Sequence, residues 1–353
     1  MKQKKKKKMP VVFKILIAVL LLVVIVLGAG YAYAQHTLGK INKTTTEDNK
    51  KIDPSEETFE TDEDKADESS DSDLQKILPE DVIWPDLTKD IMKDRDVVNI
   101  MLIGQDRREG QGRQRSDSMM MVTINKKKSA IQVTSFMRDL YVQIPGYSDN
   151  RMNAAYQFGG MDLLDQVVEK NFGVHIDGNI EVDFEGFQSC IDLLGGIDLE
   201  LSQREADYVI GNSQTVLDPQ AKDEDWDLKE GMNHLNGEQA LIHARNRSVG
   251  NSDYERTNRQ REVLTAAFEK AKKSDLNTIL KLIDKGFPLL TTDLSHGDLM
   301  GYAMTVFTMG AGNVESYRIP QDGSFRPAVI RKMDVLVPDL TQCRSYLQEN
   351  LYQ

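Results

Sequence analysis

The chain has 353 residues, a formal net charge of −12, 40% hydrophobic residues and 28% charged residues. An excess of acidic residues excludes a generally basic surface, so a site for an anion has to be a local reversal of charge. Two cysteines, Cys190 and Cys343, and five scattered histidines provide neither a disulfide framework nor the ligand spacing of a zinc site. Because Cys190 lies in an apolar stretch, we expect two unpaired thiols, and a disulfide in an exported chain is the alternative.

The N-terminal segment has the pattern of a membrane anchor. Residues 1–10 form a basic tail with six lysines, and residues 11–34 hold a nearly uncharged apolar run. A helix of twenty such residues rises about 30 Å, which spans the hydrocarbon core. Lysines before a span keep that end in the cytoplasm. We therefore expect a single-pass protein of the cell membrane whose folded domain is extracellular. A cleaved signal peptide is the alternative, because Ala32-Tyr33-Ala34 resembles a cleavage site.

Residues 35–94 are predicted to form a disordered, acidic extracellular linker. Between Glu47 and Asp73 the chain has thirteen acidic residues and three lysines, with almost no large apolar side chain. Such a segment buries too little apolar surface to offset its chain entropy, and its charges repel one another. We expect it to hold the folded part away from the bilayer.

Residues 95–353 are predicted to fold as one α/β domain, because strand-like and helix-like segments alternate along them. Short apolar runs predict strands at residues 97–104, 118–125, 129–136, 180–184 and 317–320. Apolar residues at helical spacing predict helices within residues 161–170, 187–194, 237–245, 252–272, 276–285, 297–309 and 339–351. Together these elements predict a mixed central β-sheet flanked by helices.

Two carboxylates, Asp106 and Asp117, bracket a ten-residue loop after the first predicted strand of this domain. Loops at strand ends are where α/β folds place ligands. A loop of this length can bring both carboxylates to one point, and carboxylates with phosphate oxygens are ligands that suit Mg²⁺. The spacing allows a Mg²⁺ site. The competing interpretation is a solvated hairpin loop of mixed charge.

The stretch Leu241–Val263 is a concentrated reversal of charge, with five arginines and no lysine. Arginine presents a flat fork of donors that fits pairs of phosphate or carboxylate oxygens, so the stretch predicts recognition of an anion. Asp253, Arg256 and Gln260 fall on one stripe of a predicted helix, which could lie at the margin of a cleft. A surface helix with Asp–Arg pairs is the competing interpretation.

Eight short segments occur in an order that resembles the LytR-CpsA-Psr (LCP) family of bacterial cell-envelope proteins. They are IGQDRRE, RSDSMMMVTIN, SFMRDLYVQIP, RMNAAYQFGG, IEVDFEGF, IDLLGGIDLEL, LNGEQALIHARNR and DYERTNRQREV. These segments span a motif core at residues 97–272, which is most of the predicted domain. No single segment is very specific, and the resemblance rests on their common order behind the predicted anchor.

The resemblance implies a mixed central sheet flanked by helices, with an apolar cavity that accepts a polyprenyl chain. It also implies a Mg²⁺-dependent phosphotransferase. The substrate would be an anionic glycopolymer, such as wall teichoic acid or a capsular or secondary polysaccharide, moved from a polyprenyl-pyrophosphate carrier to peptidoglycan. Phosphoryl transfer depends mainly on positioning and charge neutralisation, which arginines and a divalent ion supply.

Residue by residue, the resemblance assigns metal binding to Asp106 and Asp117, with Mg²⁺ as the expected ion and Mn²⁺ as the alternative. The implied catalytic residues are Arg138, Asp253 and Arg256, with Asp253 in a supporting or base role. The implied pyrophosphate-binding residues are Arg107, Arg115, Arg138, Arg245, Arg247, Arg256, Arg259 and Gln260. The chain departs from the usual family pattern at Phe136-Met137, Arg151 and His243, where Ile-Pro, Lys and Tyr are common.

Other functions would use the same residues. The family includes proteins described as transcriptional attenuators, but a cytoplasmic tail of ten residues is too short to fold as a DNA-binding domain. We therefore expect no nucleic-acid partner, and any regulation would be indirect. A polyprenyl-pyrophosphate glycan hydrolase, or a module that only binds the lipid-linked precursor, are the remaining alternatives.

Overall fold

The computed structural model describes residues 39–59, 74–85, 91–105, 112–213, 226–250, 252–309 and 314–353. The predicted tail and anchor, the most acidic part of the predicted linker, and the predicted ligands Asp106 and Arg107 lie outside these ranges. Within the described ranges, no helix has both the length and the apolar character needed to cross a membrane.

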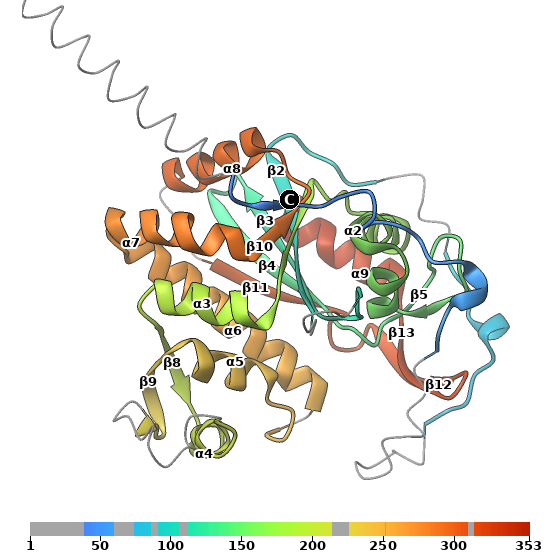
Figure 1. Ribbon diagram of the computed structural model, residues 1–353. Helices are drawn as coiled ribbons and strands as arrows, with labels where there is room; N and C mark the ends of the chain where they lie inside the picture. The colour runs from blue at the N-terminus through green and yellow to red at the C-terminus, as the bar shows by residue number, and fades with distance from the viewer. Residues whose placement is uncertain are drawn as a thin grey trace, which may run out of the picture.

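A seven-stranded mixed sheet forms the centre of the described chain, in the order β1-β10-β7-β2-β3-β4-β11 (Figure 1). Strands β2, β3 and β4 are antiparallel neighbours, whereas β7 runs parallel to β2 and β11 runs parallel to β4. The strands of this sheet are β1 (Asn42–Lys43), β2 (Val97–Gln105), β3 (Ser116–Asn125), β4 (Ala130–Phe136), β7 (Gly178–Val182), β10 (Leu290–Thr292) and β11 (Val314–Ile319). The predicted class, a mixed central sheet flanked by helices, is confirmed.

Helices cover both faces of the sheet, and alternation along β2 explains the division. Met101 and Ile103 pack in the core that includes α2 (Met152–Phe172) and α9 (Leu340–Leu347). Val98 and Ile100 face the other way, toward α8 (His296–Thr308). The second face is also covered by α3 (Phe184–Leu193), α5 (Gly237–Arg245), α6 (Ser252–Lys273) and α7 (Leu276–Lys281) (Figure 1). Because this sheet is buried on both faces, its central strands read as nearly continuous apolar runs.

Two smaller units extend the domain. The antiparallel pair of β8 (Ile197–Leu201) and β9 (Gly231–Leu235) packs with α4 (Gln203–Gly211) and α5 around a separate apolar cluster. The hairpin of β12 (Phe325–Ile330) and β13 (Met333–Pro338) lies near the short pair β5 (Tyr141–Val142) and β6 (Asn150–Arg151). Neither α4 nor the β12–β13 hairpin was predicted from the sequence pattern.

The predicted linker is wrong for the parts of residues 35–94 that the structure describes. Strand β1 pairs with β10 at the edge of the sheet, and Ile41 is 6% exposed. Ile77 and Val82 are buried against the β12–β13 hairpin. The physical reason is that backbone pairing and a few well-placed apolar side chains fix the chain, even where its composition is acidic. The acidic stretch at residues 60–73 is outside the described ranges.

Several element boundaries differ from the prediction. The helix expected within residues 161–170 begins at Met152, and a break at Gly159 and Gly160 interrupts it. Gly160 has a φ of +66°, which a residue with a Cβ rarely adopts, so the chain can turn there without strain. The strand expected to reach Phe184 ends at Val182, because the Asp183 side chain accepts a hydrogen bond from the Gly186 N–H and begins α3. Cys190 and Cys343 are unpaired, as expected.

Candidate functional site

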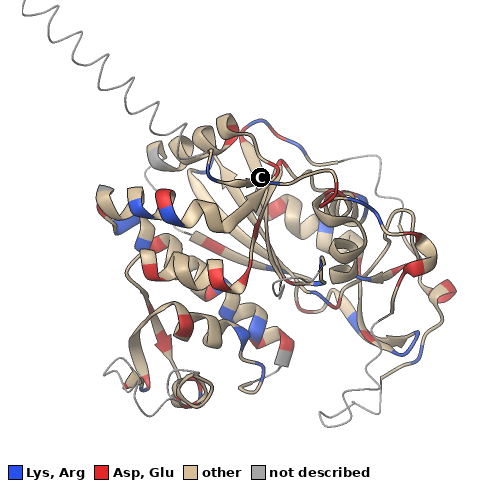
Figure 2. Ribbon diagram, viewed as in Figure 1, with Lys and Arg blue, Asp and Glu red and all other residues tan. Residues whose placement is uncertain are grey.

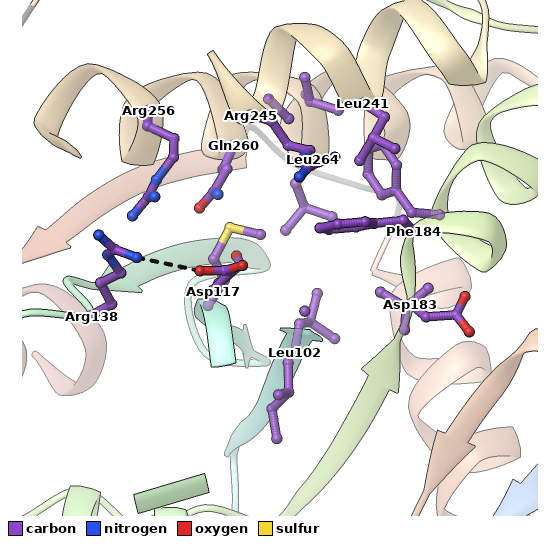
Figure 3. A pocket seen from close by; sticks show the side chains of 18 of the residues that line it. Leu102, Asp117, Arg138, Asp183, Phe184, Leu241, Arg245, Arg256, Gln260 and Leu264 are labelled. Atoms are coloured by element: carbon purple, nitrogen blue, oxygen red, sulfur yellow. Dashed lines mark hydrogen bonds and ion pairs between the residues drawn. The ribbon is translucent and has the colours of Figure 1, made fainter. Parts of the chain in front are cut away.

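A cavity of about 560 Å³ lies between the sheet and the helices α3, α5 and α6 (Figure 3). Its inner part is apolar. Leu102 and Met120 project from β2 and β3, and helical side chains close the other side. The apolar side chains from α3, α5 and α6 are Phe184, Phe187, Leu241, Val263 and Leu264. A largely apolar cavity with few polar groups is a typical ligand site, and this one suits a hydrocarbon chain.

The mouth of the cavity is strongly basic (Figure 3). Its polar lining consists of Asp117 on β3, Arg138 after β4, Arg245 at the end of α5, Arg247 in the following loop, and Arg256 and Gln260 on α6. In Figure 2, blue positions lie near the start of α6 and in the loop after α5, the two segments that carry Arg256 and Arg247. Elements that are distant in the sequence therefore converge on one anion-binding surface.

Local structure explains why α5 and α6 present these side chains. Asn236 and Gln239 form a reciprocal capping box that begins α5, and Arg245 falls in its last turn, where the helix dipole favours a cation. The guanidinium of Arg245 lies 4.3 Å from the centre of the Phe184 ring, which holds it over the apolar wall. On α6, Arg256 and Gln260 are four residues apart, so both face the cavity.

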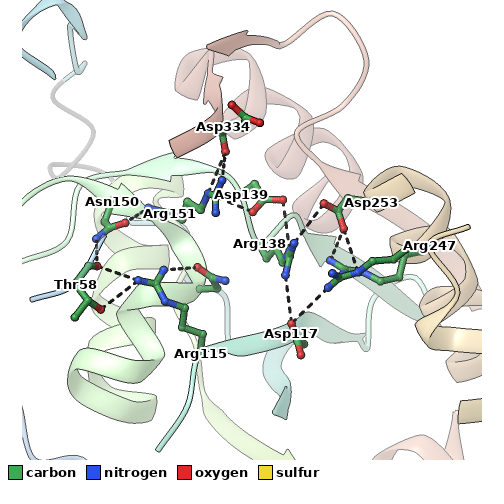
Figure 4. Close-up of polar contacts among 12 residues, drawn as sticks. Thr58, Arg115, Asp117, Arg138, Asp139, Asn150, Arg151, Arg247, Asp253 and Asp334 are labelled. Atoms are coloured by element: carbon green, nitrogen blue, oxygen red, sulfur yellow. Dashed lines mark hydrogen bonds and ion pairs between the residues drawn. The ribbon is translucent and has the colours of Figure 1, made fainter. Parts of the chain in front are cut away.

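Arg138 is the centre of an ion-pair network at the mouth (Figure 4). Its guanidinium nitrogens lie 3.5 Å from carboxylate oxygens of Asp117, Asp139 and Asp253. Arg247 is 3.9 Å from Asp117 and 3.8 Å from Asp253. Contacts of 3.5 Å or more are long for charge-assisted hydrogen bonds. These acids therefore position the arginines at the mouth of the cavity.

Arg256 has the strongest features of an anion ligand. Its side chain is 5% exposed, and its Nη2 atom lies 2.9 Å from Asp253 Oδ1. Its Nε and Nη1 atoms are buried without a hydrogen-bond partner among the described residues. Burial, together with the nearby positive charge of Arg138, lowers the pKa of Arg256 to about 10. Buried donors without partners are costly, and a bound phosphate would satisfy them.

The pKa values of the two carboxylates beside Arg138, those of Asp253 and Asp139, shift in opposite directions. Burial would raise the pKa of Asp253, but Arg138, Arg256 and Arg247 outweigh it and lower that pKa to about 2. Burial raises the pKa of Asp139, and the charge of Asp253 adds to the increase, whereas Arg138 and Arg151 oppose it. Asp253 is thus a permanent anion that orients arginines. A carboxylate with so low a pKa is a weak base, so the geometry favours its supporting role.

Two of the predicted pyrophosphate-binding residues, Arg259 and Arg115, do not line the cavity, and their role in binding stays a prediction from the motifs. Arg259 is 3% exposed and lies 2.7 Å from Glu205, and its other nitrogens donate to the carbonyls of Asn246 and Val249. Consecutive residues of an α-helix are rotated by about 100°, so Arg259 points away from the face of Gln260. Arg115 donates to Asn153 Oδ1 and to the carbonyl of Thr58, and it holds the N-terminal segment.

Of the two predicted metal ligands, Asp117 lies within the described ranges and Asp106 does not. Asp117 lines the cavity, and its side chain is 38% exposed. The arginine contacts to its Oδ1 atom are 3.5 Å and 3.9 Å long, so the carboxylate keeps lone pairs for a cation. No group of three or more His, Cys, Asp or Glu side chains that could hold a metal occurs in the described ranges. Mg²⁺ commonly uses one or two carboxylates together with waters and phosphate oxygens, and Asp117 fits that role.

A buried Arg151–Asp139 pair supports Arg138 and was not among the predicted site residues. Arg151 is 2% exposed, its Nε lies 3.4 Å from Asp139 Oδ1, and it donates to the carbonyl of Asp334. The sequence offered only one signal, the position of Asp139 directly after Arg138 at the end of a strand. Arg151 lies on β6 and Asp334 lies on β13, so spacing along the chain could not reveal that they pack beside Asp139.

Comparisons with known proteins identify the family of this chain. Residues 32–347 match the family model described as "LytR_cpsA_psr family". The polyisoprenyl-teichoic acid–peptidoglycan teichoic acid transferase TagT of Bacillus subtilis (strain 168) is 30% identical over 268 residues, which are 74% of this chain and 80% of TagT. The regulatory protein MsrR of Staphylococcus aureus (strain COL) is 29% identical over 241 residues, 66% of this chain and 68% of MsrR.

Solved structures give the same result. The structure of TagT bound to LI-WTA aligns with a TM-score of 0.58 and 25% identity, and the alignment covers 75% of this chain and 96% of TagT. The crystal structure of B. subtilis TagV aligns with a TM-score of 0.57 and 26% identity over 73% of this chain and 98% of TagV. Because the family match extends over most of its length, this chain belongs to the LytR_cpsA_psr family.

Proposed function

We propose that this chain is a phosphotransferase that moves an anionic glycopolymer from a polyprenyl-pyrophosphate carrier to peptidoglycan. The observation that carries the proposal is one cavity with an apolar interior and an arginine-rich mouth, in which two buried Arg256 donors have no hydrogen-bond partner among the described residues. The activity agrees with the name of the relative TagT, a polyisoprenyl-teichoic acid–peptidoglycan teichoic acid transferase. Wall teichoic acid is the substrate class that this name favours, and a capsular or secondary polysaccharide is the alternative.

The two parts of the cavity match the two parts of the carrier. The apolar side chains of α3, α5 and α6 would surround the polyprenyl chain, which gains from leaving water. The pyrophosphate would lie at the mouth, within reach of Arg138 and Arg256, with Arg245, Arg247 and Gln260 around it. Arg107, outside the described residues, is proposed as a further ligand from its motif position.

The reaction requires charge neutralisation more than covalent chemistry. The acceptor hydroxyl oxygen bonds to the glycan-side phosphorus while the bond from that phosphorus to the bridging oxygen breaks. Polyprenyl phosphate leaves with the bridging oxygen, and the hydroxyl proton is released. Arg138 and Arg256 would stabilise the charge that develops on the phosphate oxygens. Asp253 would hold both guanidinium groups in position, as its ion pairs do now.

Asp117, together with Asp106 from its motif position, would hold a divalent cation, Mg²⁺ or alternatively Mn²⁺. When bound, such an ion supplies neutralisation of phosphate charge.

For the cellular location, we propose that residues 11–34 anchor the protein in the cell membrane, with residues 1–10 in the cytoplasm and the catalytic domain outside.

The direct test is reconstitution of the full chain in detergent micelles with lipid-pyrophosphate-linked glycan, peptidoglycan and Mg²⁺. We expect glycan that is covalently joined to peptidoglycan and an equal amount of polyprenyl phosphate. Release of glycan phosphate without attachment would assign hydrolysis instead, and binding without either product would assign a carrier module. The relative named as a regulatory protein motivates a parallel transcript measurement, in which a catalytically inactive variant should lose any effect if regulation is indirect.

A further inference from the structure

A second cavity, of about 700 Å³, lies beside the reacting centre. Asp139 and Asp253 line it, and Arg138, which lines the first cavity, is ion-paired with both of these acids. The two cavities share no lining residue, so Arg138 forms part of the wall between them. Figure 4 shows this guanidinium between Asp117 on one side and Asp139 and Asp253 on the other. The reacting centre can therefore be approached from two directions.

The charges of the two cavities are opposite. Among the described residues, four arginines line the first, with Asp117 and Asp183 as the acids. The charged residues that line the second are Arg318 and the acids Asp139, Asp253, Glu255, Asp322 and Asp334. Arg318 is ion-paired with Asp322 and lies 4.8 Å from the centre of the Tyr254 ring, so its charge is largely compensated. An anionic polymer on its carrier is attracted to the first cavity and repelled by the second.

The second cavity has the groups that an uncharged, hydroxyl-bearing ligand needs. Tyr254 and Phe325 pack together with ring centres 5.8 Å apart, and Pro327 and Leu336 add apolar surface. Carboxylates only accept hydrogen bonds, so they select ligands rich in O–H and N–H donors. The Oδ1 atom of Asp139 is buried and accepts no hydrogen bond among the described residues, although Arg151 Nε lies 3.4 Å away. Sugar hydroxyls, acetamido groups and amines are donors of this kind.

We infer that the second cavity is the acceptor subsite, which binds a segment of a peptidoglycan glycan strand so that a sugar hydroxyl reaches the phosphate beside Arg138. This inference rests on the proposed transfer function, and it assigns the specificity of the acceptor to Tyr254, Glu255 and Phe325. The division also explains how one small site keeps two polymers apart, because the acidic side chains of the second cavity disfavour the anionic donor.

The test measures binding of each substrate separately in the full chain. Calorimetry would use soluble peptidoglycan fragments made of several disaccharide units, and short-chain polyprenyl pyrophosphate would be titrated in parallel. For Phe325→Ala and Glu255→Lys we expect the affinity for fragments to fall about tenfold or more, equivalent to ~1.4 kcal/mol, with the affinity for polyprenyl pyrophosphate unchanged. The matched control is Glu200→Lys, which changes the same charge at an exposed position on β8.

Three outcomes would overturn the inference. They are unchanged fragment affinity in both folded variants, equal losses for fragments and polyprenyl pyrophosphate, and displacement of bound polyprenyl pyrophosphate by fragments. Because binding is measured without turnover, a protein that hydrolyses its donor would still support the subsite if the fragments bind as expected. Circular dichroism would show whether either variant is misfolded. Tyr254→Ala would then be measured in its place.

Discussion

Arg256 and Asp253, three residues apart on α6, form an ion pair of 2.9 Å at the mouth of the apolar cavity. The second carboxylate oxygen of Asp253 lies 3.5 Å from Arg138. One acid on a helix therefore orients two arginines from different elements toward the same point. Because the pKa of Asp253 is lowered to about 2, this arrangement keeps its charge at every pH that the cell envelope meets.

Replacing Arg256 with lysine tests whether the shape of the guanidinium matters. Lysine keeps the charge but loses the planar fork that contacts two phosphate oxygens. We expect the turnover number to fall about 100- to 1,000-fold, as for the loss of one donor at an oxyanion site, with the melting temperature nearly unchanged. The rate of glycan transfer is the measurement. Arg204→Lys, at an exposed position of α4, is the control, and near-normal transfer by Arg256→Lys would remove Arg256 from the mechanism.

Replacing Arg259 with alanine should change the stability of the protein rather than its transfer activity. Arg259 pairs with Glu205, which also caps α4, so its loss should lower stability while the folded fraction keeps most of its transfer activity. Burial would raise the pKa of Glu205, but the hydrogen bond from Arg259 and those at Ser202 lower it to about 2, from 4.5 in an unfolded chain. Glu205 therefore stabilises the fold above about pH 4.5, and this contribution is lost as the pH falls toward 2.

Chemical denaturation at a series of pH values checks this prediction. The free energy of unfolding of the parent chain should decrease between pH 4.5 and pH 2, and the decrease should be smaller in Arg259→Ala because Glu205 has lost its main cationic partner. If the variant were instead fully stable and inactive, Arg259 would be a substrate ligand after all, as its motif position suggested.

The contrast between Arg256 and Arg259 shows what the sequence could and could not predict. Helical spacing placed Asp253, Arg256 and Gln260 on one face, and the structure confirms that Arg256 and Gln260 line the cavity. The role of Arg259 depends on Glu205, which is 54 residues away in the chain. Contacts of this kind arise from tertiary packing, so local periodicity carries no information about them.

The same distinction applies to the fold. Strands β2, β3 and β4 follow from uninterrupted apolar runs, because both faces of the central sheet are covered. The edge strand β1 cannot be predicted from an apolar run, because its pairing with β10 uses backbone groups that any sequence has. Residues 39–59 therefore had the composition of a linker but pack on the domain through Ile41 and through the Arg113 contact with the carbonyl of Lys50.

Narrowing the apolar cavity should separate binding of the lipid from chemistry at the phosphate. Leu264 lines the cavity from α6, and Leu264→Trp would fill part of its volume. We expect the KM for long-chain polyprenyl donors to rise several-fold, whereas donors with a short lipid should be affected less, because only the long chain needs the inner part. Steady-state kinetics with both donors is the measurement, and Leu264→Met is the matched control. An equal effect on both donors would place the lipid elsewhere.

Removing the divalent cation tests the proposed metal site at Asp117. After treatment with a chelator, we expect transfer to stop and to return when Mg²⁺ or Mn²⁺ is added. Asp117→Asn keeps the size of the side chain but removes its charge, so it should need a higher Mg²⁺ concentration for half-maximal activity. Asp183→Asn is the matched control, because Asp183 also lines the cavity but caps α3. Asparagine caps a helix about as well as aspartate, so this change should leave both the stability and the metal requirement nearly unchanged. Full transfer by the chelated parent chain would mean that the arginines neutralise the pyrophosphate alone, with Asp117 serving only to position Arg138 and Arg247.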